Sequence, residues 1–427
     1  MFRPMLFAAS RNTFLPRLSL CYRRQFGSTS PAWAVRALFS ETDNEQLNAC
    51  LKVIQETIIL PAYLPPKQRK LVFNPNMRDD LEVNPVVIEV EDKQYRFPPL
   101  DREKDVPNVN VAFQDAVGMM KTRRDWDNLP TLLAGYRKAH AQLSYKTIGR
   151  MCREAAYTGN IQAVIECVKQ WQETGLTLST WELIHRTFVA NNAKIYVNSG
   201  DKQAAEQAYA QVQVLFDLLH RPEHTVDGSG SRSKPPFSPL CRGMHLYALC
   251  SAIKAKQLDG KDVEKDMNSL REELNLFTPL WNEAAISDIN SIPEAQIANP
   301  SEDAKRRKQV GVNGYVYLQM MLQVARGCEM AVEFVGDDAR YLNRVRDAII
   351  AHVAEFVRHA WGRDETWDDV HEKIMGYRPD WPPYEHREDF KYSYLRRVAR
   401  RKKLAAASDG ATPQESGTDE GKVDAKM

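Results

Sequence analysis

The stretch that decides the fold reads DWDNLPTLLAGYRKAHAQLS from Asp125 to Ser144 and NIQAVIECVKQWQETGLTLS from Asn160 to Ser179. Apolar residues of the first segment recur 35 residues later in the second. The matched pairs are Trp126 and Ile161, Leu129 and Val164, Leu132 and Cys167, Leu133 and Val168, and Tyr136 and Trp171. Their spacing is that of one helix face. A helical segment copied at a fixed step predicts stacked repeats, an α-solenoid.

Another helix is predicted immediately before each of these segments. Phe113, Ala116, Val117 and Met120 map at the same offset onto Ile148, Met151, Cys152 and Ala155. Each unit is therefore predicted to be a helix-turn-helix pair, and a third unit with a longer first helix follows up to residue 220. We predict an all-α fold, an α-solenoid of such repeats with a small extended or hairpin segment before it and further helices after it.

Composition shifts divide the chain into seven predicted regions. They are a mitochondrial transit peptide (1–40), a helix with an extended or hairpin segment (41–107), the repeats (108–220), a flexible Gly/Ser/Pro-rich loop (221–240), further helical hairpins or capping helices (241–362), an aromatic and basic segment (363–403) and a disordered tail (404–427). The first region is rich in Arg and Ser, and its first acid comes only at Glu41, which is typical of mitochondrial transit peptides. The alternative is a basic arm that binds nucleic acid or an anionic membrane.

The whole chain argues against several classes of function. Seven scattered cysteines without a C-x-x-C pair fit a reducing compartment better than disulfides or zinc. His359, His371 and His386 lie among carboxylates without fixed ligand spacing, so we predict no metal site. No phosphate-binding loop, dinucleotide fingerprint or hydrolase motif is present. We therefore predict no catalytic residues, no cofactor and no enzymatic activity. No apolar run is long enough to predict a transmembrane segment.

The 35-residue step, with Gly159 in one turn and Gly175 sixteen residues later at the end of the unit, resembles the pentatricopeptide repeat family. The resemblance implies an organellar protein whose first helices read a single RNA strand, one base per repeat. The base-reading position of the second unit is Arg150 by the glycine register and Thr147 by the Leu-Ser-Tyr start. Its partner would be Thr177 or Thr180, which implies no base preference.

Basic residues supply the other candidate RNA contacts. Lys121, Arg123 and Arg153, together with Lys194, are placed on the first-helix face. A run without acids near the C-terminus carries Arg396, Arg397, Arg400 and Arg401. These arginines either neutralise RNA phosphates or form a solvated helix end.

Two functions remain open from the sequence. The first is a mitochondrial-matrix protein that binds single-stranded or ribosomal RNA in transcript stability, translation or the mitoribosome. The second is a protein-binding scaffold for assembling a respiratory complex, located at the periphery of the inner membrane. A positive first-helix face would favour the first, and a neutral or acidic face the second. The partner and the oligomeric state are not defined by the sequence.

Overall fold

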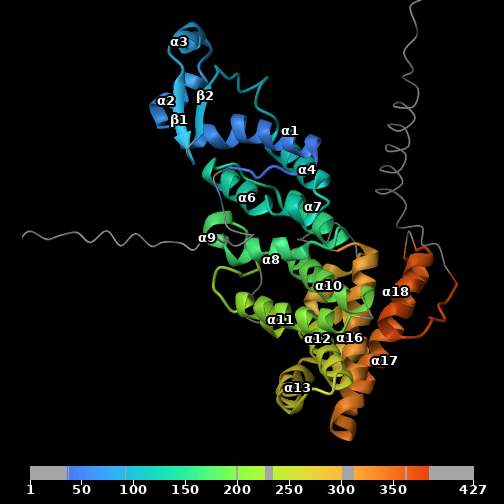
Figure 1. Cartoon of the computed structure of the whole chain (residues 1–427). Coiled ribbons are helices and arrows are strands. Elements are labelled where there is room, and N and C mark those ends of the chain that lie inside the picture. The colour runs from blue at the N-terminus through green and yellow to red at the C-terminus, as the bar shows by residue number, and fades with distance from the viewer. Residues whose placement is uncertain are drawn as a thin grey trace, which may run out of the picture.

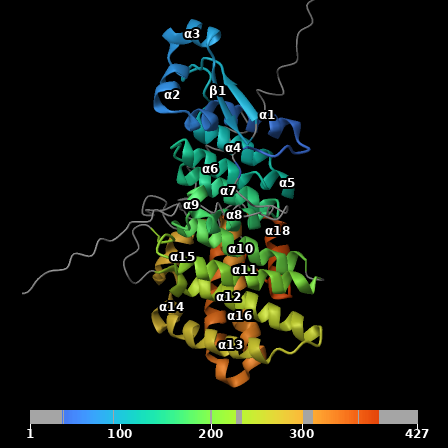
Figure 2. The ribbon, with the colours of Figure 1, turned by 60° about the vertical axis from the view of Figure 1, so that its left-hand side comes forward.

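The computed structural model describes residues 36, 38–91, 93–198, 201–226, 234–300, 312–360 and 363–383. The predicted tail (404–427) and, apart from residues 36 and 38–40, the predicted transit peptide (1–40) lie outside these ranges. Figure 1 shows an elongated body of stacked helices that follows chain order from the N-terminal end to about residue 277, after which the helices from residue 314 onward lie back against those at 181–258. Figure 2 shows the same stack from the side.

The elements up to the third predicted unit are short helices, one hairpin and then longer helices. They are α1 (Glu45–Ile54), α2 (Pro66–Val72), α3 (Arg78–Val83), β1 (Val86–Val90), β2 (Lys93–Phe97), α4 (Val109–Met119), α5 (Arg123–Trp126), α6 (Leu129–Lys138), α7 (Tyr145–Tyr157), α8 (Ile161–Lys169), α9 (Trp171–Thr174), α10 (Trp181–Val197) and α11 (Lys202–Leu219).

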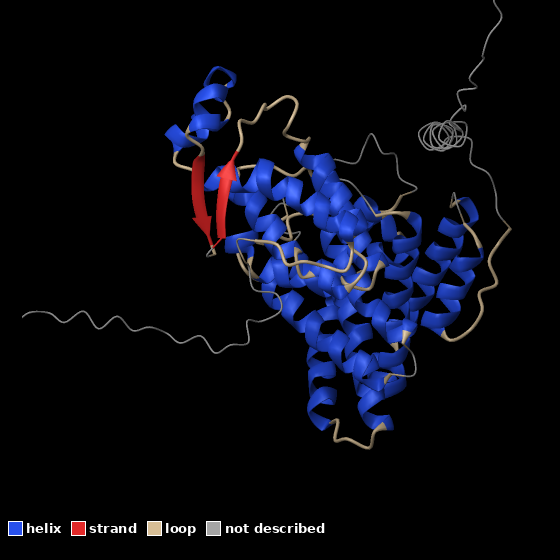
Figure 3. Ribbon diagram, turned by 45° about the horizontal axis from the view of Figure 1, so that its top comes forward, coloured by secondary structure: helices blue, strands red, loops and turns tan. Residues whose placement is uncertain are grey.

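The remaining elements are all helical. They are α12 (Pro239–Leu258), α13 (Glu264–Phe277), α14 (Glu283–Ser287), α15 (Pro293–Ala298), α16 (Gly314–Val335), α17 (Tyr341–His359) and α18 (Glu365–Met375). The predicted all-α class is confirmed, and the predicted hairpin is present as β1 and β2, paired antiparallel from Val86 opposite Phe97 to Val90 opposite Lys93. Figure 3 shows the two strands at one end of an otherwise helical body.

The helix pairs at 108–220 lie side by side. The first helices α4, α7 and α10 pack on one another in turn, and α6 packs on α8 and α9. Of the 18 matched apolar positions, all but Ile148 and Trp171 are buried. A hydrogen bond also joins consecutive units, because Ser144 N donates to Asn110 Oδ1 at 2.9 Å. Neighbouring pairs therefore bury one another's apolar faces, as expected for a solenoid.

Polar caps fix where each first helix begins. Asn108, Ser144 and Thr180 each accept a backbone N–H of the first turn of α4, α7 and α10. Such caps satisfy donors that have no partner within the helix. The second unit ends at Gly175, whose φ of 73° is readily adopted by glycine. A polar cap thus fixes where each unit begins, and in the second unit a glycine fixes where it ends.

After the third unit the packing changes. α12 lies against α11 and α16, and α17 and α18 cover α16. α12 and α16 run parallel, since Gly243 faces Val324 and Ser251 faces Met330. A Cβ at Gly327 would lie 2.8 Å from the backbone N of Tyr247. The absence of a side chain at Gly327 therefore allows this close approach of two backbones.

One sequence prediction about helix bounds is wrong. The apolar pattern predicts two long helices, 304–326 and 330–361, with a break around Gly327. In the structure α16 runs through Gly327 and ends at Gly336, which has a φ of 74°. Gly327 is a packing residue inside a helix, whereas Gly336 terminates one. The predicted residues 304–311 lie outside the described ranges.

We predict that Gly327→Val lowers the free energy of unfolding by about 2 kcal/mol, within the range of about 1–3 kcal/mol typical of overpacked cores. The added atoms would meet backbone atoms of α12, which cannot move aside as a flexible side chain can. Urea denaturation followed by circular dichroism measures the change.

Gly118→Val is the matched control for this substitution. A Cβ at Gly118 would meet only the tip of Arg150 at 3.6 Å. We therefore expect a change smaller than about 1 kcal/mol. Equal losses in the two variants would contradict the close approach of α12 and α16.

Candidate RNA- and protein-binding surfaces

α7 carries three of the predicted RNA contacts, and Thr147 is its first. Thr147 is fully buried. Its hydroxyl donates to Asn110 Oδ1 at 2.8 Å and accepts from Gln114 Nε2 at 2.9 Å. Both partners belong to α4, so Thr147 joins two repeat units. The prediction that Thr147 reads a base is not supported, because the side chain has no surface for a nucleotide.

Arg150 lies one turn further along α7. Its Nη1 donates to Gln114 Oε1 at 2.9 Å, and its Nε lies 3.8 Å from Glu154 Oε1. The side chain is 40% exposed. Arg150 thus remains accessible, but a carboxylate on the same helix already offsets part of its charge.

Arg153 belongs to a charged cluster between α7 and α10. Glu182 Oε1 accepts from Arg153 Nη1 at 3.1 Å and from Arg186 Nε at 2.9 Å. Glu182 and Arg186 are each only 5% exposed, whereas Arg153 is 42% exposed. Burial and the adjacent Arg186 lower the pKa of Arg153, and Glu182 opposes them. One carboxylate therefore serves two guanidinium groups, and Arg153 faces solvent.

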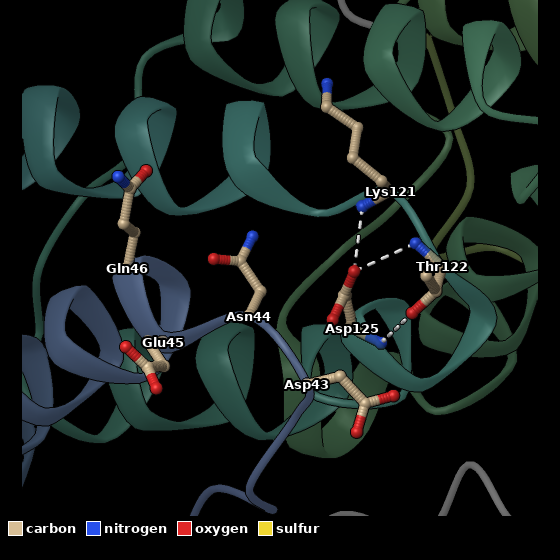
Figure 4. Close-up of a pocket in the computed structure, with 7 residues that line it drawn as sticks. All are labelled: Asp43, Asn44, Glu45, Gln46, Lys121, Thr122 and Asp125. Carbon is tan, nitrogen blue, oxygen red and sulfur yellow. Dashed lines mark hydrogen bonds between the residues drawn. The ribbon is translucent and has the colours of Figure 1, made fainter.

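Lys121 and Arg123 lie at the turn between α4 and α5, beside the start of α1. Asp125 Oδ2 accepts the backbone N–H groups of Lys121 and Thr122 at 2.9 and 2.8 Å. Burial raises the pKa of Asp125, but these hydrogen bonds outweigh it and the net shift is downward. The side chain of Lys121 extends away from this carboxylate (Figure 4).

The depression around Lys121 is acidic rather than basic. Its lining residues are Asp43, Asn44, Glu45, Gln46, Lys121, Thr122 and Asp125. Asp43 also lies 3.6 Å from Arg124. Lys121 and Arg123 are exposed and can reach a phosphate outside the depression, whereas the depression itself does not suit an anion.

The first-helix face is not a bare positive stripe. Arg150 and Arg153 both have carboxylate partners. Lys194 is half-buried and donates to Gln211 Oε1 at 3.1 Å, and burial lowers its pKa. Arg396, Arg397, Arg400 and Arg401 lie outside the described residues. The face is thus of mixed charge in the part that the structure describes.

A groove that the sequence did not reveal runs between α7, α10, α16 and α18. Its volume is about 540 Å³. Apolar side chains of α10, α16 and α18 line it, among them Val189, Ala193, Val316 and Val370. Arg153 and the 90% exposed Tyr157 border it on α7. The four helices are far apart in sequence, so no local pattern could have indicated it.

The described residues contain neither a candidate metal site nor a candidate membrane-spanning helix. Within them, no three His, Cys, Asp or Glu residues are grouped so that they could hold a metal ion. No helix among the described residues combines the length and apolar character needed to cross a bilayer.

α10 also contains an unusual histidine. His185 is fully buried and stacks on Trp181 at 5.4 Å between ring centroids. Neither of its ring nitrogens has a hydrogen-bond partner among the described residues. Burial lowers the pKa of His185 to about 3. The ring is therefore neutral in the folded protein at physiological pH.

Comparison with known proteins gives two matches. A family model described as mitochondrial ribosomal protein mS27 matches residues 24–375. The small ribosomal subunit protein mS27 of Neurospora crassa is 27% identical in an alignment of 265 positions that covers 59% of this chain and 66% of that relative. The matched region thus spans slightly less than two thirds of the length of this curated relative.

We predict that Glu182→Gln lowers the free energy of unfolding by about 3 kcal/mol, because removing one partner of a buried ion pair leaves the other charge uncompensated. Arg186 would be the stranded group. The exposed pair Arg344–Glu283, at 2.8 Å, provides the control. Glu283→Gln should leave the urea midpoint unchanged within error, and a similar loss in both variants would contradict the role of Glu182.

We also predict that His185 contributes to the loss of stability in mild acid. The unfolded chain binds a proton near pH 6.5 and the folded chain only near pH 3. The contribution is therefore complete above pH 6.5 and is lost as the pH falls. Between pH 7.5 and 5.5, wild type should lose about 1.4 kcal/mol more than His185→Leu. Identical pH dependence of the two urea midpoints would overturn this expectation.

Proposed function

The chain belongs to the mitochondrial ribosomal protein mS27 family, and from this premise we propose that it is a structural component of the small subunit of the mitochondrial ribosome. The observation that carries the proposal is the family match over residues 24–375, which includes nearly the whole described body. Its role lies in mitochondrial translation. Ribosomal proteins of such a family are structural rather than enzymatic.

The proposed location is the mitochondrial matrix. The acid-free segment before Glu41 supports import into mitochondria, and the family supports residence with the ribosome. The location at the periphery of the inner membrane, also considered from the sequence, has no support from the relatives. The alternative function, a scaffold for assembling a respiratory complex, is less well supported, since the matched proteins are ribosomal by name.

The proposed RNA contact is with ribosomal RNA, through phosphates rather than bases. Thr147 is enclosed between α4 and α7, so this side chain cannot contribute to base reading of the pentatricopeptide kind. Lys121, Arg123, Arg150 and Arg153 each expose part of a cationic side chain. Such groups fix a protein on RNA without selecting a sequence.

The C-terminal arginines are the strongest proposed phosphate contacts, because no acid interrupts residues 391–403. Each neutralised phosphate contributes about 0.7–0.9 to the slope of log K against log salt concentration. A variant in which Arg396, Arg397, Arg400 and Arg401 are all changed to Ala should therefore lower that slope by about 3. The measurement is binding of the purified chain to mitochondrial small-subunit RNA at four salt concentrations.

The control changes four arginines outside the proposed contact. They are Arg340, Arg344, Arg346 and Arg358, all changed to Ala. This variant should keep the wild-type slope. An equal decrease in both variants would overturn the specific contact and indicate general electrostatics.

Sedimentation of mitochondrial extracts tests the ribosomal assignment separately. The wild-type chain should migrate with the small subunit in a sucrose gradient. Absence from that fraction would overturn the ribosomal role, whereas presence with an unchanged salt slope would overturn only the RNA contact.

A further inference from the structure

The groove between α7, α10, α16 and α18 is built differently from an RNA-binding surface. Its floor is apolar, with Val189 and Val370 buried and Ala190, Ala193 and Val316 partly buried. Ala190 and Ala193 of α10 have small side chains, so the groove stays open above them. A phosphate placed against the floor would lose hydration, and these apolar side chains offer no donor to replace it. The floor therefore suits apolar side chains.

Polar side chains hold the walls of the groove in place. Tyr196 of α10 accepts from Gln319 Nε2 of α16 at 2.8 Å, and Arg186 donates to Asn313 Oδ1 at 3.3 Å. Both contacts join α10 to the segment that begins α16. The groove is therefore a fixed feature of the packing between the repeats and the later helices, rather than a gap between loosely placed elements.

The charges around the floor are unequal. Arg153, Arg186 and Lys373 line the groove, whereas Asp369 is the one carboxylate among the lining residues that the structure describes. The buried Glu182 pairs with both Arg153 and Arg186. Asp369 also lies 4.0 Å from Arg378. The exposed part of Arg153 is left to attract an acid from outside. The lining thus combines an apolar floor with a positive rim.

From this combination we propose that the groove is a docking site for an amphipathic segment of a neighbouring protein, whose apolar side chains enter over Ala193 and whose acidic residue pairs with Arg153. A volume of about 540 Å³ accommodates a few side chains, as in grooves that receive one face of a helix. Tyr157, at the rim on α7, supplies an exposed aromatic contact.

Charge argues against residues 391–403 of this chain as the occupant. Residues 391–403 are basic without an acid, and the rim of the groove is positive. A partner with an acidic residue is the complementary choice. The proposal assigns Arg153 to the protein partner. The RNA contact proposed above then rests on Lys121, Arg123, Arg150 and the arginines at 396–401.

Site-specific photo-crosslinking in intact mitochondrial ribosomes locates the occupant. A benzophenone amino acid replaces Tyr157 in one full-length chain and Val197, 65% exposed at the groove, in another. Both should cross-link the same peptide of one protein, and that peptide should contain apolar residues and at least one Asp or Glu. Replacement of Tyr145, exposed on α7 but not among the lining residues of the groove, is the control and should not capture that peptide.

Binding of the captured sequence then tests the recognition itself. A synthetic peptide of that sequence should bind the purified full-length chain, and Ala193→Trp and Arg153→Gln should each weaken binding at least 10-fold. Replacing the peptide's acid by its amide should weaken binding to wild type but have little further effect on Arg153→Gln, because both changes remove one interaction. Arg340→Gln, an exposed arginine away from the groove, should leave binding unchanged.

Several outcomes would overturn the proposal. They are cross-links from both positions to RNA, cross-links to residues 384–427 of the same chain, no cross-link at either position, and peptide binding that Ala193→Trp leaves intact. Normal sedimentation of the chain with the small subunit in any of these cases would leave the ribosomal role standing.

Discussion

The mutual burial of repeated apolar faces is the constraint on which the rest of this structure depends. Each helix pair at 108–220 presents a face that neither of its helices can cover alone, and the next pair covers it. Within one unit, Phe113 and Tyr136 pack edge to face, with ring centroids 5.4 Å apart and both side chains buried. The next unit covers this unit through contacts of α7 with α4 and of α8 with α6. Apolar burial of this kind contributes about 25 cal/mol for each Å² removed from water. The stack in turn fixes the spacing between the surfaces that we propose for RNA and for protein.

Polar groups inside the stack set the register of the units. Asn110, Gln114 and Thr147 bind one another between α4 and α7, and Glu182 holds arginines from α7 and α10. Buried polar groups are costly unless they are paired, so these contacts disfavour other alignments of the same apolar faces. The same pairing encloses Thr147, which is one of the two positions that the resemblance to pentatricopeptide repeats assigned to base reading. A repeat fold can thus be retained while a side chain at a base-reading position packs between units instead of contacting a base.

Much of the helical body could be predicted because its signal is local. The 35-residue copy, the cap residue Ser144 and the turn residue Gly159 are each visible within a short window of sequence. The hairpin was equally predictable from the two short stretches Val86–Val90 and Tyr95–Phe97, which flank a charged turn. By contrast, the role of Gly327 depends on the backbone of Tyr247 in another helix, and the burial of Thr147 depends on Asn110 and Gln114. The groove required α7, α10, α16 and α18 to meet, which no sequence pattern expresses.

The most direct test is a cryo-electron microscopy reconstruction of the mitochondrial small ribosomal subunit that contains this chain. The stacked arrangement predicts α4, α7 and α10 side by side, Thr147 enclosed between units, and ribosomal RNA contacted through phosphates by basic side chains. A reconstruction in which these helices are separated, or in which bases insert beside Thr147, would contradict it.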